Sequence, residues 1–171
     1  PLQQWEKRGI TVLSIGEVEG NPFQKMVNRY DSVACYSLLR TATAQQIKKV
    51  YAELNNYDMI ICSVHGTHIA ESKALTQLVQ KKNVVFVFFT LPYYTQEYKT
   101  SLQRAKGVVM AYEASVLSQQ YAAQVLFGGI AARGKLPVSV PKMFAAGTGL
   151  NTAKNRLGYH EPEEVGLSAA R

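Results

Sequence analysis

Residue types that often act in catalysis or metal binding are scarce in this chain, so few of its residues indicate a chemical function directly. The 171 residues include two Cys, three His, one Trp and only two Asp, Asp31 and Asp58. The cysteines, Cys35 and Cys62, fall in strand-like segments, which predicts buried free thiols; a disulfide would need neighbouring strands of suitable geometry. The longest apolar run, Val84 to Phe89, is far shorter than the ~20 residues that cross a bilayer. We therefore expect no membrane span.

Concentrated positive charge is also missing, although the formal net charge is +7 and the pI is about 9.4. The basic residues are scattered, and the two short pairs, Lys48-Lys49 and Lys81-Lys82, fall in predicted helices. A solvated helix face explains such pairs, and no nucleic-acid-binding signature accompanies them. The sequence therefore predicts no nucleic-acid partner.

What the chain does have is a regular alternation of apolar strands and helical stretches. We predict strands at 9–15, 33–38, 59–64, 84–89 and 108–111, and helices at 43–54, 70–81, 95–104 and 115–127, the last capped by Ser115. This alternation predicts an α/β fold with a doubly wound, mainly parallel sheet sandwiched by helices, a flavodoxin- or Rossmann-like three-layer arrangement.

The end of the predicted domain is marked by glycines and prolines. Gly128 and Gly129 are expected to end the last helix with positive φ angles, and Pro137 and Pro141 to keep the following chain extended. The remaining residues are rich in Gly, Asn and charge and show little periodicity. We therefore expect a domain over residues 1–141 and a tail or interdomain connector over 142–171.

Ligands of open parallel sheets bind at the loops that follow the carboxyl ends of the strands. The first such loop, between Gly16 and Gly20, matches neither phosphate-binding glycine pattern, and Glu17 and Glu19 would repel a phosphate. Gly147-Thr-Gly149 lacks a third glycine. The sequence therefore disfavours a nucleotide, and we expect no cofactor.

The loop after the third strand is the most polar candidate. It contains His65, Thr67, His68 and Glu71, which could ligate a metal or act as acid and base. No His-Glu-x-x-His motif or Cys pair completes a metal site, so we expect no metal, and a surface loop before a helix explains the same residues. Ser63 beside His65 lacks the Gly-x-Ser-x-Gly context of a nucleophile.

Two further groups have both a functional and a structural interpretation. Glu113, where the fifth strand meets its helix, could bind a ligand hydroxyl, but Glu113 and Ser115 are also typical of a helix cap. Tyr93, Tyr94 and Tyr98 could stack on a sugar or dock against another domain.

Several motifs together resemble the C-terminal domain of family 3 glycoside hydrolases, most of all the β-N-acetylglucosaminidases. They are Tyr112-Glu-Ala-Ser115, Ala122-Ala-Gln-Val-Leu-Phe-Gly-Gly129, Gly134-Lys-Leu-Pro-Val-Ser139, Asn56-Tyr-Asp-Met-Ile-Ile61 and Arg156-Leu-Gly-Tyr159. The resemblance implies an accessory domain that packs on an N-terminal (β/α)8 barrel of the same parent chain. That barrel would carry the Asp nucleophile and the His acid/base and would bind the carbohydrate, so the isolated chain is expected to be inactive.

In the β-glucosidase branch of this family the C-terminal domain supplies a Glu acid/base. Glu71 lies in a comparable loop, although the Gly-Glu-x-Pro-Tyr pattern of that branch is absent. Glycoside hydrolysis normally needs two carboxyl groups about 5 to 9.5 Å apart, and spacing designates no pair among Glu17, Glu71 and Glu113. Expected substrate-rim residues are His65, Thr67, His68 and Glu113.

The last residues, Tyr159-His-Glu-Pro-Glu-Glu-Val-Gly-Leu167, resemble a junction to a β-lactamase-like serine hydrolase domain. The resemblance thus implies the middle part of a longer, exported bacterial protein. The alternative, from a different class, is a free-standing flavodoxin-like module that binds a small ligand.

Overall fold

The structure is a computed structural model that describes residues 9–67 and 71–154. Within these residues the strands are β1 (Ile10–Ile15), β2 (Ala34–Leu38), β3 (Met59–His65), β4 (Asn83–Phe89) and β5 (Gly107–Met110). The helices are α1 (Pro22–Val27), α2 (Ala44–Leu54), α3 (Lys73–Lys81), the 3₁₀ helix η2 (Pro92–Tyr98), α4 (Lys99–Leu102) and α5 (Val116–Leu126).

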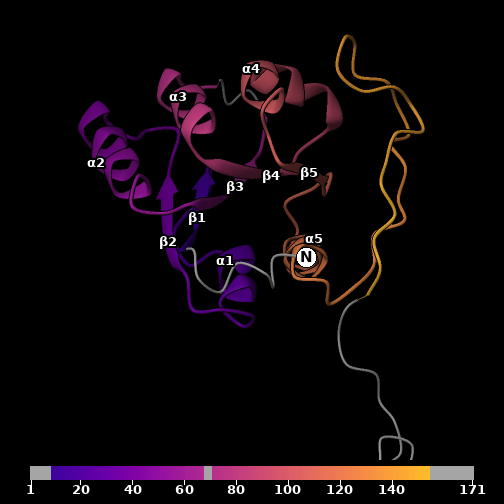
Figure 1. Ribbon diagram of the computed structural model, residues 1–171, viewed down its shortest axis with the longest axis horizontal. Helices are drawn as coiled ribbons and strands as arrows, with labels where there is room; N and C mark the ends of the chain where they lie inside the picture. Colours follow the sequence, from indigo (N-terminus) through magenta and orange to yellow (C-terminus); the bar gives the residue numbers. More distant parts are fainter. Residues whose placement is uncertain (1–8, 68–70, 155–171) are drawn as a thin grey trace, which may run out of the picture.

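The strands form one sheet in the order β2-β1-β3-β4-β5, and every neighbouring pair is parallel. This is the flavodoxin-like order, in which the chain moves to one side of β1 and then to the other. Figure 1 shows α2, α3 and α4 on one face of the sheet and α1 and α5 on the opposite face. The predicted doubly wound, three-layer α/β fold is confirmed.

Each face of the sheet has its own apolar core. Leu13, Phe86 and Phe88 pack toward α2, α3 and η2, whereas Ile61 and Phe89 pack toward α1 and α5. The central strands β3 and β4 are buried along almost their whole length, as both faces of a parallel sheet require.

Side-chain caps fix the starts of the helices. Thr43 and Gln46 form a reciprocal capping box at α2, and Ser72 and Ser115 accept hydrogen bonds from main-chain N–H groups of α3 and α5. The predicted Ser115 cap is therefore confirmed. The helix predicted from residue 70 starts later, at Lys73, because Ser72 takes the cap position.

The prediction differs from the structure at two further elements. Helix α1 was not predicted, although Asn21 caps it and Pro22 occupies its first turn. The predicted helix at 95–104 is replaced by η2 and the four-residue α4. Pro92 starts the 3₁₀ turn, and Thr95 Oγ1 donates a hydrogen bond to the Pro92 carbonyl (2.6 Å), which competes with regular helix bonding.

The two glycines after α5 have different roles. Gly128 has a φ of 75°, as predicted, whereas Gly129 is not among the residues with positive φ. A Cβ atom on Gly129 would collide with the hydroxyl of Tyr30, so the second glycine permits close approach and does not supply a left-handed turn.

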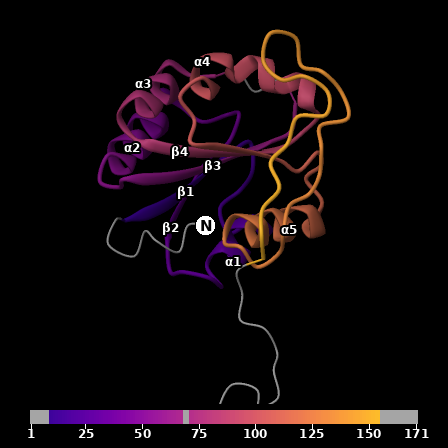
Figure 2. The same ribbon diagram turned by 45° about the vertical axis from the view of Figure 1, so that its right-hand side comes forward.

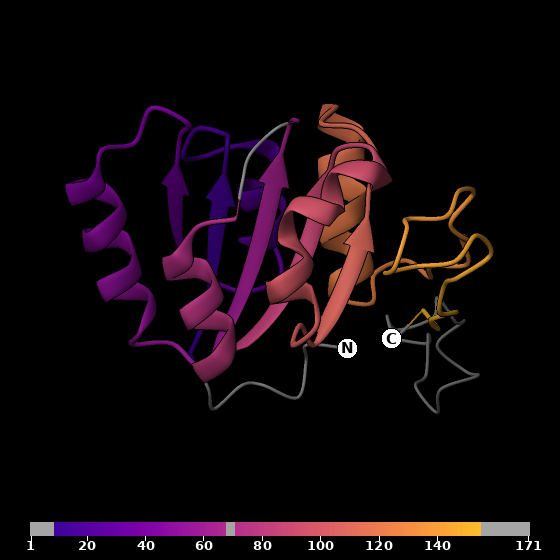
Figure 3. The same cartoon turned by 90° about the horizontal axis from the view of Figure 1, so that it is seen from above.

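Residues 132–152 form a loop that closes on itself beyond β5. Thr152 N–H donates to the Ala132 carbonyl (2.9 Å), and Leu136 N–H donates to the Thr148 carbonyl (2.8 Å). Figures 2 and 3 show this orange-to-yellow loop on the β5 side of the molecule, away from α2. These bonds cross the expected boundary between residues 141 and 142, which stays a prediction.

Two smaller expectations are also addressed by the structure. Both cysteines are free thiols; Cys62 is buried and Cys35 is partly buried. In the described part of the chain, none of the helices has the length and apolar character needed to cross a membrane.

Candidate functional site

The carboxyl edge of the sheet, where β1 and β3 diverge toward different helices, carries a buried polar network. Ser14 and Ser63 occupy paired positions on β1 and β3, are fully buried, and their hydroxyl oxygens lie 2.8 Å apart. Asn21 Nδ2 and Gln24 Nε2, from the start of α1, donate to Ser14 Oγ over 3.1 and 3.0 Å. Hydroxyl and amide groups thus replace apolar packing at the usual ligand-binding edge of this fold.

His65, the last residue of β3, ends this network. Its Nε2 lies 3.0 Å from Ser63 Oγ, and its ring stacks on Phe89 with the centroids 4.6 Å apart. The side chain is only 3% exposed, and Nδ1 has no hydrogen-bond partner within the described residues. An unsatisfied buried polar atom is costly, and Thr90 Oγ1, directly after β4 at the same edge, also has no partner among the described residues.

We assign the hydrogens of the network by counting donors and acceptors. Ser14 Oγ accepts from both amides, so its own hydrogen is directed to Ser63 Oγ. Ser63 then donates its hydrogen to His65 Nε2, its remaining partner. In a neutral imidazole the other nitrogen carries the hydrogen, so the network leaves Nδ1–H as an unused donor.

The environment keeps His65 uncharged. Burial lowers the pKa of its imidazole to about 4, and the negative charge of Glu17 opposes this shift only partly. At neutral pH the ring is therefore a neutral hydrogen-bonding group, suited to an uncharged oxygen acceptor and not to ion pairing.

The other expected rim residues of the loop after β3 are only partly described. The Thr67 carbonyl accepts a hydrogen bond from Arg40 Nη2, which lies over this loop from the end of β2. His68 lies outside the described residues. Thr67 is partly exposed and adjoins the strand end of His65, so these two sequence-predicted residues share one end of the sheet.

Glu71, the residue considered as an acid/base, has a structural contact. Its Oε1 accepts a hydrogen bond of 2.7 Å from the main-chain N–H of Ser101 in α4. The contact ties the segment before α3 to α4. The structure therefore gives Glu71 a helix-capping partner, and its catalytic role stays a prediction.

Glu113 lies at a separate strand end, beyond β5. Its Oε1 accepts a hydrogen bond of 2.6 Å from Ser115 Oγ, whose oxygen in turn accepts the Ser118 N–H. Both the capping and the ligand interpretations remain compatible with this exposed carboxylate. Within the described part of the chain, no group of three or more His, Cys, Asp or Glu side chains could hold a metal ion.

Sequence reasoning missed the interior of the site. Ser14, Asn21 and Gln24 belong to no recognisable motif. The only signal in the sequence was Ser14, a polar residue within an apolar strand. Of the three tyrosines considered for sugar stacking or domain docking, two differ in the structure. Tyr98 is buried against Phe86 and Phe88, whereas Tyr93 is half exposed.

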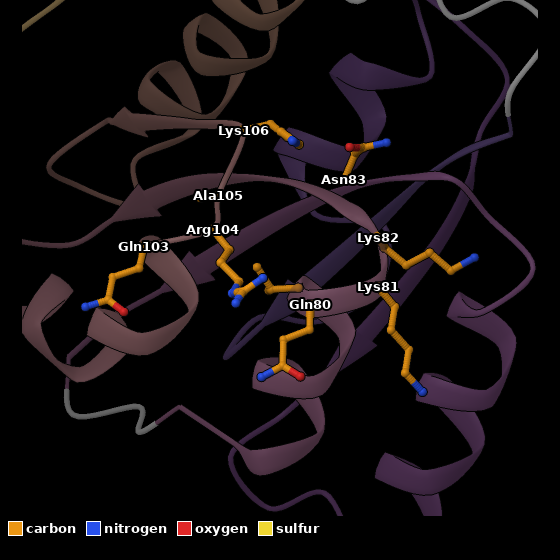
Figure 4. A pocket seen from close by; sticks show the side chains of 9 residues that line it. Gln80, Lys81, Lys82, Asn83, Gln103, Arg104, Ala105 and Lys106 are labelled. Atoms are coloured by element: carbon orange, nitrogen blue, oxygen red, sulfur yellow. The ribbon is translucent and has the colours of Figure 1, made fainter.

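The opposite, amino edge of the sheet contains a cavity of about 440 Å³ near the starts of β4 and β5. Its lining includes Lys81, Lys82, Arg104 and Lys106 and no acidic residue. Figure 4 shows that the side chains of Lys81 and Lys82 point away from Arg104. The positive groups therefore do not converge on one point.

These cations lie where helices end. Lys81 is in the last turn of α3, and Lys82 Nζ donates to the carbonyl of Asn55, the residue that caps the C-terminus of α2 (2.7 Å). Helix C-termini carry partial negative charge and unpaired carbonyls, which favour lysine and arginine. The basic lining is explained as compensation of helix ends, so we place the candidate site at the carboxyl edge.

The strand order and the helices on both faces define a flavodoxin-like α/β domain. No protein-family model and no curated protein matches the chain. Among solved structures it is similar to a protein described as a fungal multi-domain GH3 β-N-acetylglucosaminidase with a GCN5-related glucosamine N-acetyltransferase region. The TM-score is 0.61 at 15% identity, over 84% of this chain and 17% of that one.

It is also similar to a GH3 exo-β-xylosidase, XlnD, studied in complex with a xylobiose aziridine probe. Here the TM-score is 0.56 at 11% identity, over 76% of this chain and 21% of that one. At these identities the likeness shows the fold, and the chain spans about a fifth of the length of each protein. The motifs at Arg156–Tyr159 and Tyr159–Leu167 lie outside the described residues.

Proposed function

We propose that this chain is the accessory C-terminal domain of a family 3 glycoside hydrolase that acts on β-linked N-acetylglucosamine-type sugars. It would pack on a (β/α)8 catalytic barrel of the same parent chain and border one side of the sugar site. The sequence motifs and the fold shared with GH3 enzymes support this proposal. Residues 1–141 would form this domain and residues 142–171 a tail or interdomain connector. The parent would be an exported bacterial protein that continues into a β-lactamase-like serine hydrolase domain.

The observation that carries the proposal is the uncharged outer side of α5. The eleven residues of this helix include no charged side chain. Ala122 and Ala123 face the core, yet Val116, Leu117 and Tyr121 on its outer side are 56%, 64% and 53% exposed. A helix with apolar side chains both inside and outside is typical of one that packs against a second partner.

The proposed division of chemical roles is compatible with the described contacts. No nucleophile is assigned to this chain, and the Glu71 carboxylate is already engaged with α4. His65, Thr67 and Glu113 would instead offer hydrogen-bonding groups at the carboxyl edge, with His68 as a further candidate. The barrel would supply both catalytic groups.

The test compares the isolated chain with its parent. The reading frame upstream should encode a barrel, and only the longer protein should release 4-nitrophenol from its β-N-acetylglucosaminide. Leu117→Glu on α5 should lower the activity and stability of the parent, whereas Leu150→Glu, at an exposed position in the 132–152 loop, should not. Robust activity of the isolated chain, or a parent without a barrel, would contradict the proposal.

The alternative is a free-standing module that binds a small ligand at the same edge. The unused donor of His65, at the strand end favoured for ligands, is the observation that favours it. A start codon immediately upstream and a protein that is stable, soluble and monomeric after Leu117→Glu would support this alternative over the accessory domain.

A further inference from the structure

Tyr112, directly after β5, has a backbone conformation that tyrosine rarely adopts. Its φ is 65°, and across it the N–H of Glu113 donates to the carbonyl of Ala111 (2.8 Å). A three-residue turn of this kind with positive φ is rare and strained. Glycine would take it without strain, so the presence of tyrosine calls for an explanation.

The start of α5 holds this turn in place. Ser118 Oγ donates to the Ala111 carbonyl (2.8 Å), and Ser115 Oγ donates to the Glu113 carboxylate (2.6 Å). The helix is fixed in turn by Gln119, a buried side chain that accepts from the Phe23 N–H and donates to the Ala114 carbonyl. The surrounding structure therefore determines the conformation of Tyr112.

The strain is not offset by burial of the tyrosine ring. Tyr112 is 39% exposed, and within the described residues it belongs to neither apolar core and to no pair of stacked or edge-on rings. Residues with a strained backbone are often found at active sites and ligand-binding sites, where the surrounding structure holds them in place. One oxygen of the neighbouring Glu113 is held by Ser115, and the carboxylate is otherwise exposed.

We propose that Tyr112 and Glu113 form a saccharide-contact element, in which the ring lies against the apolar face of a pyranose and Glu113 accepts a sugar hydroxyl hydrogen bond. A pyranose has an apolar face, which an exposed aromatic ring can cover, and hydroxyl groups, which an adjacent carboxylate can bind. The choice of an N-acetylglucosamine-type sugar rests on the proposed function. The strain on Tyr112 is the independent observation that identifies the element.

The test uses the full 171-residue chain and N,N′-diacetylchitobiose as the probe, followed by amide NMR. We expect saturable shifts confined to residues near 111–118, with a dissociation constant on the order of 1–10 mM. Tyr112→Ala, which removes the ring, and Glu113→Gln should each weaken binding about fivefold or more.

Tyr112→Gly separates a binding role from a structural one. It should weaken binding about as much as Tyr112→Ala yet raise the urea midpoint of unfolding, because glycine relieves the strain. Lys142→Gly is the matched control, since Lys142 is the other described non-glycine residue with positive φ (60°); it should leave binding unchanged.

Three results would overturn the inference: no shifts at high probe concentration, unchanged binding in Tyr112→Ala, or salt-sensitive binding of argininamide in place of sugar, which would indicate a cation site. None of these depends on the parent enzyme. The proposed function fails on its own test, the absence of a barrel or of glycosidase activity in the parent, so the two failures are distinguishable.

Discussion

The two edges of the sheet hold polar groups for opposite reasons. At the carboxyl edge, Ser14, Ser63 and His65 are buried and neutral and are directed at one another, and among the described residues His65 Nδ1 has no partner. At the amino edge, Lys81, Arg104 and other cations surround a cavity but diverge from one another. Positive charge alone would place the candidate site at the amino edge. The unsatisfied hydrogen-bonding group of His65 places it at the carboxyl edge.

The topology explains this difference. In a parallel sheet every crossover helix ends at the amino edge, so its carbonyl groups attract lysine and arginine there. Every such helix begins at the carboxyl edge, where side chains such as Asn21 and Ser115 cap main-chain N–H groups. Many polar residues of both edges thus serve the helices first, and a buried group left without a partner in the described part of the chain, such as His65 Nδ1, is one indication of a ligand.

The largest expected effect concerns the neutral state of His65. An unfolded histidine has a pKa of about 6.5, whereas burial lowers the folded pKa to about 4. Between these pH values the unfolded chain binds a proton that the folded chain does not. Stability is therefore complete above pH 6.5 and falls as the pH decreases toward 4, by about 3 kcal/mol.

Urea unfolding of the wild type and His65→Gln at a series of pH values measures this contribution. The difference between the two curves isolates the imidazole from the carboxylates, which titrate in both proteins. We expect the wild type to lose more stability than the variant between pH 6.5 and 4. Parallel curves would show that His65 is accessible to water and would remove the contrast between the edges. Nitrogen NMR of the wild type should also show the hydrogen on Nδ1.

The sequence predicts the sheet and its two edges but not the polar contacts that distinguish the edges. Alternating apolar strands were sufficient for the sheet, because β3 and β4 are buried on both faces and read as continuous apolar runs. Ser14 and Ser63 are 49 positions apart and meet only because β1 and β3 pair in that register. His65 was a candidate from its place in a loop, but its burial and unused nitrogen depend on Phe89 and on the tertiary structure.

The next largest effect is expected from the centre of the polar network. Ser14→Ala removes the acceptor shared by Asn21 and Gln24 and the donor to Ser63. Because both amides keep other partners, we expect a loss of about 2 kcal/mol in the free energy of unfolding. Ser32→Ala, at an exposed position, is the control and should change little. Equal effects of the two substitutions would show that the network adds no stability.

A smaller effect is expected where the carboxyl edge meets α5. Ser115→Ala removes the cap of this helix and the hydrogen bond to Glu113, so we expect a loss of about 1 kcal/mol, measured by thermal or urea unfolding. Ser115→Asp should retain most of the stability, since aspartate caps equally well. It should nevertheless weaken any sugar binding at Glu113, because it introduces a like charge beside that carboxylate.

The smallest effects are expected at the amino edge, and they test whether its cavity is only a consequence of helix ends. Arg104→Ala and Lys106→Ala should each change the free energy of unfolding by less than about 0.5 kcal/mol, as exposed substitutions usually do. Addition of phosphate should leave the wild-type midpoint nearly unchanged at constant ionic strength. A site with millimolar affinity would instead add about 2.7 kcal/mol at a ligand concentration one hundred times its dissociation constant. If phosphate stabilised the wild type but not Arg104→Ala, the cations would converge on an anion in solution, and the amino edge would be a second binding site of this domain.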